Sequence, residues 1–177
     1  MSRMVRENQV SGLRERQWFA QVLLRQLQQR QQDGAAHGEL LALRGAVLFH
    51  LYSALVGLAR NAGSNYAVTD IEQLLSLPSI TRAFAQQQVQ SPEINLIEAA
   101  RTNTADVIHW LEQQVMAANA ASGLARRPLP PQEEGMLAMV ADDPNAVLAS
   151  GDIERLHSAV ARVKEVLEAA AAHMEEW

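Results

Sequence analysis

Apolar residues recur every three or four positions along most of the chain, the pattern of helices that bury one face. The first such stretch runs to residue 30 and breaks at Asp33-Gly34. The second, at about residues 38–61, carries a leucine-rich stripe and, beside it, a stripe of small side chains that lets another helix approach closely. We expect Gly63 to cap the end of this second helix. The narrow stripe comprises Ala46, His50, Ser53, Ala54 and Gly57.

Two short helices are expected next. Thr69 with Glu72 three residues later has the spacing of a capping box, in which each side chain satisfies a free amide of the first turn. This spacing predicts a short helix through Leu77. Pro78 suits the first turn of a further helix, which we expect to end near Gln90.

A long helix is predicted over residues 91–121. Ser91-Pro92-Glu93 combines a capping serine, a first-turn proline and an acid at the positive end of the helix dipole. Apolar residues then continue at helical spacing to about Ala121. Asn103-Thr104 is a weak point inside this helix, because both residues favour caps and turns.

The C-terminal part of the chain begins with breakers. Prolines at residues 128–131 predict a stiff extended linker. Residues 133–141 are expected to form a short helix, and Ser150 or Asp152 to cap the final one. In that final helix apolar residues alternate at three and four positions, with charge on both flanks, as in a coiled-coil seam. This C-terminal seam comprises Leu156, Val160, Val163 and Leu167, extended by Ile153 and Ala170.

These elements predict an all-α protein, a helical bundle of four to five core helices with an acidic C-terminal helical appendage. Hydrophobic residues make up 48% of the 177, but aromatic residues only 5%, so the core must be mainly aliphatic, which favours helix packing. We expect the bundle to span residues 1–122. A proline-containing linker with a short helix follows at 123–149, and the acidic helix at 150–177.

Composition also bears on compartment. The chain has no cysteine, so disulfides and thiolate metal sites are impossible and a reducing cytoplasm is expected. The first ten residues lack the apolar core of a signal peptide. No window approaches ~18 uninterrupted apolar residues, and we therefore expect no membrane span.

The net charge of −5 hides an asymmetry. Residues 1–127 carry 12 arginines and 10 acids, whereas residues 128–177 carry three basic residues and 10 acids. The first thirty residues alone hold six arginines against two acids. This asymmetry favours a solvated basic face balanced by the acidic tail, and the alternative is that the acidic C-terminal helix docks on the arginine-rich first helix or on a basic partner.

The second helix also carries a family resemblance. Its motifs, with the starts of the first and fourth helices, resemble the domain of unknown function 6586 family of short bacterial proteins. The resemblance covers residues 5–122 and implies a helical fold. No activity is established for that family, so the resemblance implies no catalytic residues, and the chain from Pro128 onward departs from it. The motifs are Leu48-Phe-His-Leu-Tyr52, Ala54-Leu55, Gly57-Leu58, Asn8-Gln9, Trp18-Phe19 and Ser91-Pro92-Glu93.

Candidate chemistry is sparse. Arg44 and His50 fit the loose Arg-to-His spacing of helical ribonucleases of the HEPN class, where the pair would serve acid–base cleavage. The structural interpretation of His50 is a core histidine bonded to a carboxylate or carbonyl. Glu154 and His157 have the spacing of a carboxylate-bridged iron motif, but a second such motif is absent. We therefore predict no catalytic, cofactor-binding or metal-ligating residues, and no cofactor.

The sequence favours a non-catalytic interaction or assembly protein, an adaptor whose partner is another protein or a second copy of itself. The main alternative is a nucleic-acid-binding protein that uses the arginine-rich first helix, with the acidic tail as regulator. A HEPN-like ribonuclease is the lesser alternative. The predicted partner-binding residues are Leu156, Val160, Val163 and Leu167 of the C-terminal seam, with Arg14 and Arg25 of the first helix. The sequence leaves open whether this seam faces a partner or packs back on its own bundle.

Overall fold

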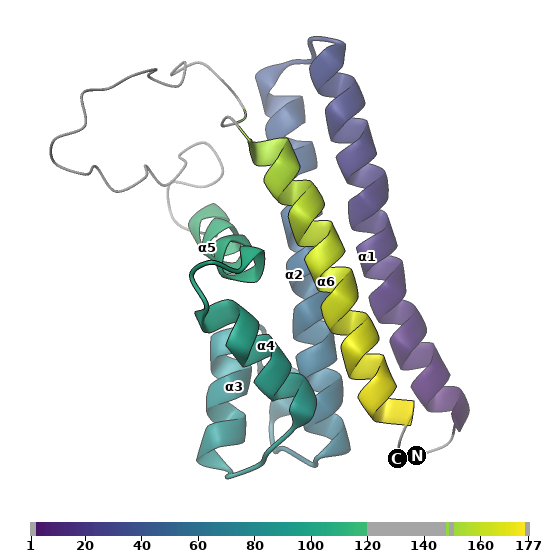
Figure 1. The fold of residues 1–177 in the computed structure, drawn as a ribbon, viewed down its shortest axis with the longest axis vertical. Helices are drawn as coiled ribbons and strands as arrows, with labels where there is room; N and C mark the ends of the chain where they lie inside the picture. The colour runs from purple at the N-terminus through teal and green to yellow at the C-terminus, as the bar shows by residue number, and fades with distance from the viewer. Residues whose placement is uncertain (1–2, 120–147, 149–150, 176–177) are drawn as a thin grey trace, which may run out of the picture.

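The computed structural model describes residues 3–119, 148 and 151–175, with side chains from residue 12 to residue 172 of these ranges. Within them the protein is all-α, six helices packed together, with one 3₁₀ turn and no strand (Figure 1). The expectations for residues 123–147 lie outside this part of the chain. The elements are α1 (Arg3–Gln32), α2 (His37–Asn65), η1 (Ile71–Gln73), α3 (Leu77–Gln86), α4 (Pro92–Thr102), α5 (Val107–Ala118) and α6 (Asp152–Glu175).

The long helices α1 and α2 form an antiparallel hairpin (Figure 1). The chain reverses at the predicted Asp33-Gly34 break, where Gly34 has a φ of 71°, a conformation that glycine adopts without strain. The small stripe of α2 does admit a neighbouring helix, as predicted. A Cβ atom on Gly57 would stand 2.7 Å from atoms of Leu13 and Arg16 on α1.

The expected end of the second helix is wrong. Helix α2 continues through Asn65, and Gly63 lies inside it, buried against Ile71. The chain leaves the helix at Tyr66 and turns at Ala67, which has a φ of 55°. Glycine is needed at position 63 because another element packs there, and not because the helix stops.

The predicted capping box is also not formed. Asp70 precedes η1 with a φ of 59° and makes no side-chain cap, and Glu72 pairs instead with Arg60 of α2. This cross-element ion pair replaces the reciprocal cap that the local spacing suggested. Ser76 caps α3 by accepting from the Ser79 amide at 3.4 Å, so this helix begins at Leu77, one residue before the predicted Pro78 start.

The single long helix predicted from Ser91 is two helices. Ser91 caps α4 as expected, accepting from the Ile94 amide at 3.3 Å. The chain then breaks at Asn103, whose side-chain oxygen accepts from the Ala105 amide at 3.0 Å, and Asp106 caps α5. The predicted weak point is thus a corner, because its asparagine offers the backbone a local alternative to the helix.

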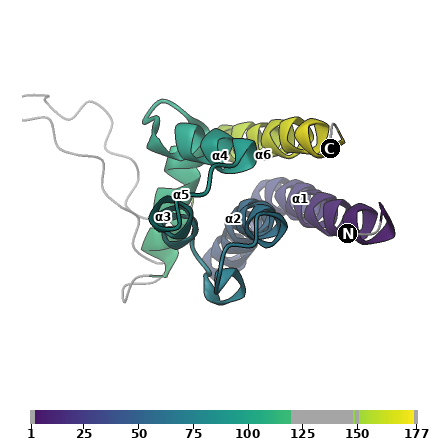
Figure 2. The ribbon, with the colours of Figure 1, turned by 90° about the horizontal axis from the view of Figure 1, so that it is seen from below.

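The C-terminal helix is a full member of the bundle and not an appendage. Helix α6 packs against α1, α2, α4 and α5 (Figure 2). Its apolar face is continuous with the core built by the other helices. Asp152, in the first turn of α6, pairs with the buried Arg44 of α2. Spacing in sequence could not predict this docking, since it depends on contacts between residues about a hundred positions apart.

Helix α2 is long and apolar enough to cross a membrane by length and composition, with a mean hydropathy of 1.6 over its most apolar window. Half of that window is buried inside the bundle. Core helices of water-soluble bundles share this composition with membrane spans. Composition alone therefore does not distinguish the two for α2.

Two glycine substitutions test the packing of α2. Gly63→Ala should lower the free energy of unfolding by about 1–3 kcal/mol, because the new methyl overlaps the buried Ile71 side chain. Gly12→Ala is the matched control: it also lies in a helix, but a Cβ there meets nothing within 4 Å. Gly12→Ala should raise the free energy of unfolding by about 0.5–1 kcal/mol, because alanine favours the helix more than glycine does. Chemical denaturation measures both, and an equal change in the two variants would contradict the packing at Gly63.

Candidate functional site

The C-terminal seam faces the interior. Leu156 and Val163 are fully buried, and Val160 and Leu167 are 7% and 8% exposed. The helices of the same chain cover this surface, so a partner would reach it only if α6 left the bundle. The partner-binding role of these four residues stays a prediction, and the arrangement gives it no support.

Arg14 and Arg25 lie exposed on α1, four residues before and seven after Trp18, so the three side chains share one stripe. Neither arginine forms an ion pair with a side chain that the structure describes. A hollow of about 380 Å³ opens beside them between α1 and α6, with Trp18 and Arg25 among its lining residues. The predicted partner role of both arginines stays untested.

The alternative charge docking of α6 on the arginines of α1 is not seen among the described side chains. The acid at the start of α6, Asp152, pairs with α2, and Arg162 of α6 pairs with Asp106 at 3.0 Å. Helix α6 meets α1 instead through buried apolar side chains such as Leu24 and Val160. Apolar packing, and not net charge, accounts for the contact.

Arg44 and His50 do not come together as a catalytic pair. The Arg44 guanidinium is buried and occupied: Nε donates to Asp152 at 2.5 Å, and Nη2 donates to Asp152 at 3.1 Å and to Gln114 at 2.8 Å. His50 is half-buried on another side of α2, against the rings of Phe19 and Phe49. It is therefore a surface-facing histidine among aromatic rings, and the expectation of a core histidine is wrong.

Glu154 and His157 both lie exposed on α6. No group of three His, Asp or Glu side chains converges as metal ligands within the described residues.

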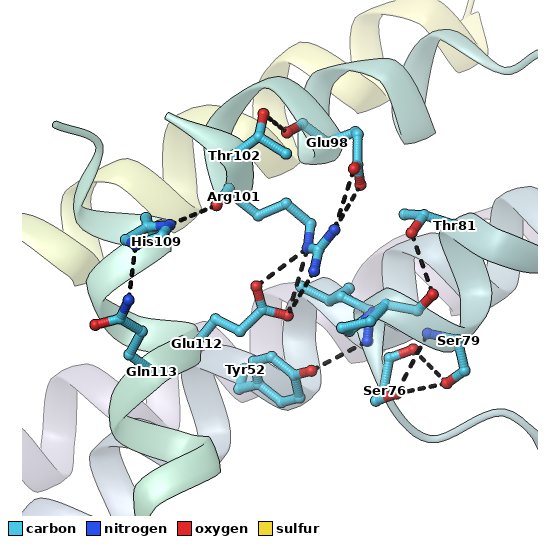
Figure 3. Close-up of polar contacts among 12 residues, drawn as sticks. Tyr52, Ser76, Ser79, Thr81, Glu98, Arg101, Thr102, His109, Glu112 and Gln113 are labelled. Atoms are coloured by element: carbon cyan, nitrogen blue, oxygen red, sulfur yellow. Dashed lines mark hydrogen bonds and ion pairs between the residues drawn. The ribbon is translucent and has the colours of Figure 1, made fainter. Parts of the chain in front are cut away.

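A network of polar side chains joins α4 and α5 (Figure 3). Arg101 lies between two carboxylates, 2.9 Å from Glu98 and 3.1 Å from Glu112. Partial burial acts to lower the pKa of Arg101, but hydrogen bonds and charges of the two glutamates outweigh it and the pKa is raised. His109 Nδ1 lies 2.8 Å from the Arg101 carbonyl oxygen, and its Nε2 2.8 Å from the Gln113 amide nitrogen.

This network serves the corner between the two helices. Its carboxylates are held by Arg101, and both nitrogens of His109 lie within hydrogen-bonding distance of a partner. Next to it, the Leu77 amide donates to the Tyr52 hydroxyl at 3.0 Å and so satisfies one of the free amides of the first turn of α3 (Figure 3). The network fixes α4 against α5, and the Tyr52–Leu77 contact joins α2 to the start of α3.

A hollow of about 800 Å³ lies along α1 and α2. Phe49 is 64% exposed and Leu75, after η1, is 73% exposed, although both are large apolar side chains. Phe19 and His50 lie between the two helices, with ring centroids 5.5 Å apart. We call this hollow the aromatic groove. It is lined by Gly12, Glu15, Arg16, Phe19, Phe49, His50, Tyr52, Ser53, Val56, Gly57, Arg60, Asn61, Glu72 and Leu75.

Four aromatic rings cross this surface in sequence. Trp18 contacts Phe19 at a centroid distance of 5.5 Å, Phe19 contacts His50, and Phe49 contacts His50 at 5.7 Å. The last two contacts are edge-on, a favourable arrangement of rings. The groove floor is held in place by Arg16, which donates to the Ser53 carbonyl at 2.7 Å.

Sequence reasoning missed the aromatic groove. It treated the stretch around Phe49 as a packing motif, because the stretch is apolar on nearly every side. The available signal was that Phe49 lies outside the leucine stripe, about 100° from Leu48 around the helix. Leu75 stands alone in a loop, and nothing near it in sequence indicates that it borders α1 and α2.

No protein family, curated protein or solved structure matches the chain. The fold class therefore rests on the structure, and the resemblance to the domain of unknown function 6586 family stays a prediction.

Replacing Tyr52 tests the polar contact beneath the groove. Tyr52→Phe should lower the free energy of unfolding by about 1–2 kcal/mol at neutral pH, because the buried Leu77 amide loses its acceptor. Burial also raises the pKa of Tyr52, so the stability from its protonated hydroxyl is complete below pH ~10 and lost as pH rises through the folded-state value. Above pH ~10 the free energy of unfolding of the wild type should therefore fall more steeply with pH than that of Tyr52→Phe.

A denaturation midpoint of Tyr52→Phe equal to that of the wild type at pH 7 would show that the Leu77 contact contributes nothing.

Proposed function

We propose that this protein is a non-catalytic interaction or assembly protein of the cytoplasm, and that its partner binds in the aromatic groove. The observation that carries the proposal is the exposure of Phe49 and Leu75 on one hollow, in a protein that buries its other large apolar stripes. The proposal keeps the class of function that the sequence favoured and moves the site from the C-terminal seam to the α1–α2 hairpin.

The free-energy cost of leaving large apolar side chains exposed to water supports this assignment. Covering a large apolar side chain yields roughly 1.5–3 kcal/mol. Clustered exposed apolar side chains rimmed by polar groups mark interaction sites, and aromatic residues dominate the energetics of such sites. Phe49 and Leu75, with Phe19 lining the same hollow, fit this description.

The shape of the groove favours an elongated partner segment. On α2 it extends from Phe49 to Asn61, which is about 18 Å at 1.5 Å per residue, or about three turns of a helix. In its floor, Arg16 of α1 lies against the small residues Ser53 and Gly57 of α2. An amphipathic helix with apolar residues one turn apart would lay its apolar face along such a surface.

Nucleic-acid binding remains the second candidate, on the observation that Arg14, Trp18 and Arg25 are exposed on one stripe of α1. The support is weaker than the sequence suggested. Arg16 is bound to the Ser53 carbonyl, and Arg30 is bound to Glu39 at 2.5 Å. The ribonuclease alternative lacks an assembled pair, since Arg44 is held by Asp152.

A photo-crosslinking amino acid at position 49 or 75 tests the proposal. Both should capture the same discrete protein in cells, and the same residue at position 116 should not. Met116 is the matched control, because it is also an exposed apolar side chain, 42% exposed, but lies on α5. Capture at 49 should disappear when Leu75→Glu is added, since a buried unpaired charge opposes binding.

Two results would contradict the proposal. One is equal labelling at positions 49, 75 and 116, which would mean that no partner prefers the groove. The other is capture of nucleic acid in place of protein by a probe at Trp18, abolished by Arg14→Ala with Arg25→Ala, which would favour the second candidate.

A further inference from the structure

We infer that the occupant of the aromatic groove is a second copy of this chain, bound through a two-fold symmetric contact between α1–α2 hairpins. The inference rests on the proposed function, because it names the partner of the same groove. In a two-fold contact the same patch faces itself, so the patch must be complementary to itself in charge and in shape.

The charges on the rim meet this condition. The groove is bordered by two acids, Glu15 and Glu72, and by two arginines, Arg16 and Arg60. A rim of one sign would repel its own copy, and a strongly acidic or basic partner would find no excess of opposite charge here.

Ion pairing among the charged residues of the rim leaves one acid available to pair with the second copy. Arg60 and Glu72 already pair with each other, with Glu72 70% exposed. Glu15 is exposed and forms no ion pair or hydrogen bond with a described side chain. It stands beside Arg16 on α1, so a two-fold axis near these residues brings Glu15 of each copy toward an arginine of the other.

The apolar part of the surface also suits a copy of itself. Phe49 and Leu75 project from the groove, and the small residues Ser53 and Gly57 line it. Protruding apolar side chains and a hollow of about 800 Å³ on one face can interlock when a second such face is turned by half a rotation. Met116, the exposed apolar residue of α5, lines none of the hollows described, and its helix α5 lies across α2 from α1 (Figure 2).

The size of the face sets the expected strength. A groove about 18 Å long on a hairpin two helices wide, at about 10 Å per helix, offers roughly 360 Å² in projection. Stable interfaces bury about 800 Å² of accessible surface per partner. The contact is therefore smaller than a stable interface, and we expect a weak dimer that dissociates on dilution.

Sedimentation or light scattering over a dilution series tests the inference. The mass should rise from the monomer value of 19.5 kDa toward twice that value as the concentration increases. Phe49→Glu and Leu75→Glu should each shift the midpoint of dimerisation at least tenfold upward, and Met116→Glu should leave it unchanged. All three side chains are exposed, so the variants should fold, which far-UV circular dichroism checks.

A charge variant provides an independent measurement. Glu15→Arg removes the free acid, so the rim would carry an excess of arginine and the two faces would repel each other. Dimerisation should weaken, and added salt should restore part of it, because exposed charges are screened over about 10 Å at 0.1 M.

A mass of 19.5 kDa at every concentration would overturn the inference, and so would a dimer that Phe49→Glu and Leu75→Glu leave intact. These outcomes are distinct from failure of the proposed function. A strictly monomeric protein that still captures a different discrete protein at positions 49 and 75 would retain the groove as the site and exclude a second copy as its occupant.

Discussion

The buried ion pair between Arg44 and Asp152 is the contact on which the arrangement of the bundle depends. It joins α2 to the first turn of α6, and Gln114 brings α5 to the same guanidinium. Side-chain exposure is 6% for Arg44 and 5% for Asp152. Burying two charges is costly, so the pair adds little over an apolar contact, but removing one partner leaves an unpaired charge inside the protein. The pair therefore specifies where α6 begins against α2.

The location of the interaction site follows from this docking. With α6 in place, the C-terminal seam closes the core over α1, α2, α4 and α5, and the apolar stripe that sequence reasoning assigned to a partner is used inside the chain. Of the large apolar side chains that remain exposed in the described part of the chain, Phe49 of α2 and Leu75 of the loop after η1 border the aromatic groove. The fold thus separates the interface that builds the bundle from the one that we assign to binding.

The sequence predicted those structural features that depend on residues close together in the chain. The helical periodicity of α1 and α2, the turn at Gly34 and the Ser91 cap follow from residues within a few positions of each other. The burial of Gly63 by Ile71, the diversion of Glu72 to Arg60 and the pairing of Arg44 with Asp152 depend on residues from 8 to 108 positions apart. The aromatic groove was missed for the same reason, because its walls come from α1, α2 and the loop after η1.

A double-mutant cycle on the buried pair tests most directly that α6 is the sixth member of the bundle. Arg44→Met and Asp152→Ala should each lower the free energy of unfolding by about 3–5 kcal/mol, because each strands a buried charge. The combined variant should lose at least about 2 kcal/mol less than the sum of the two, which chemical denaturation measures. Additive losses within about 0.5 kcal/mol would mean that the two residues do not meet in solution, and would contradict the docking of α6.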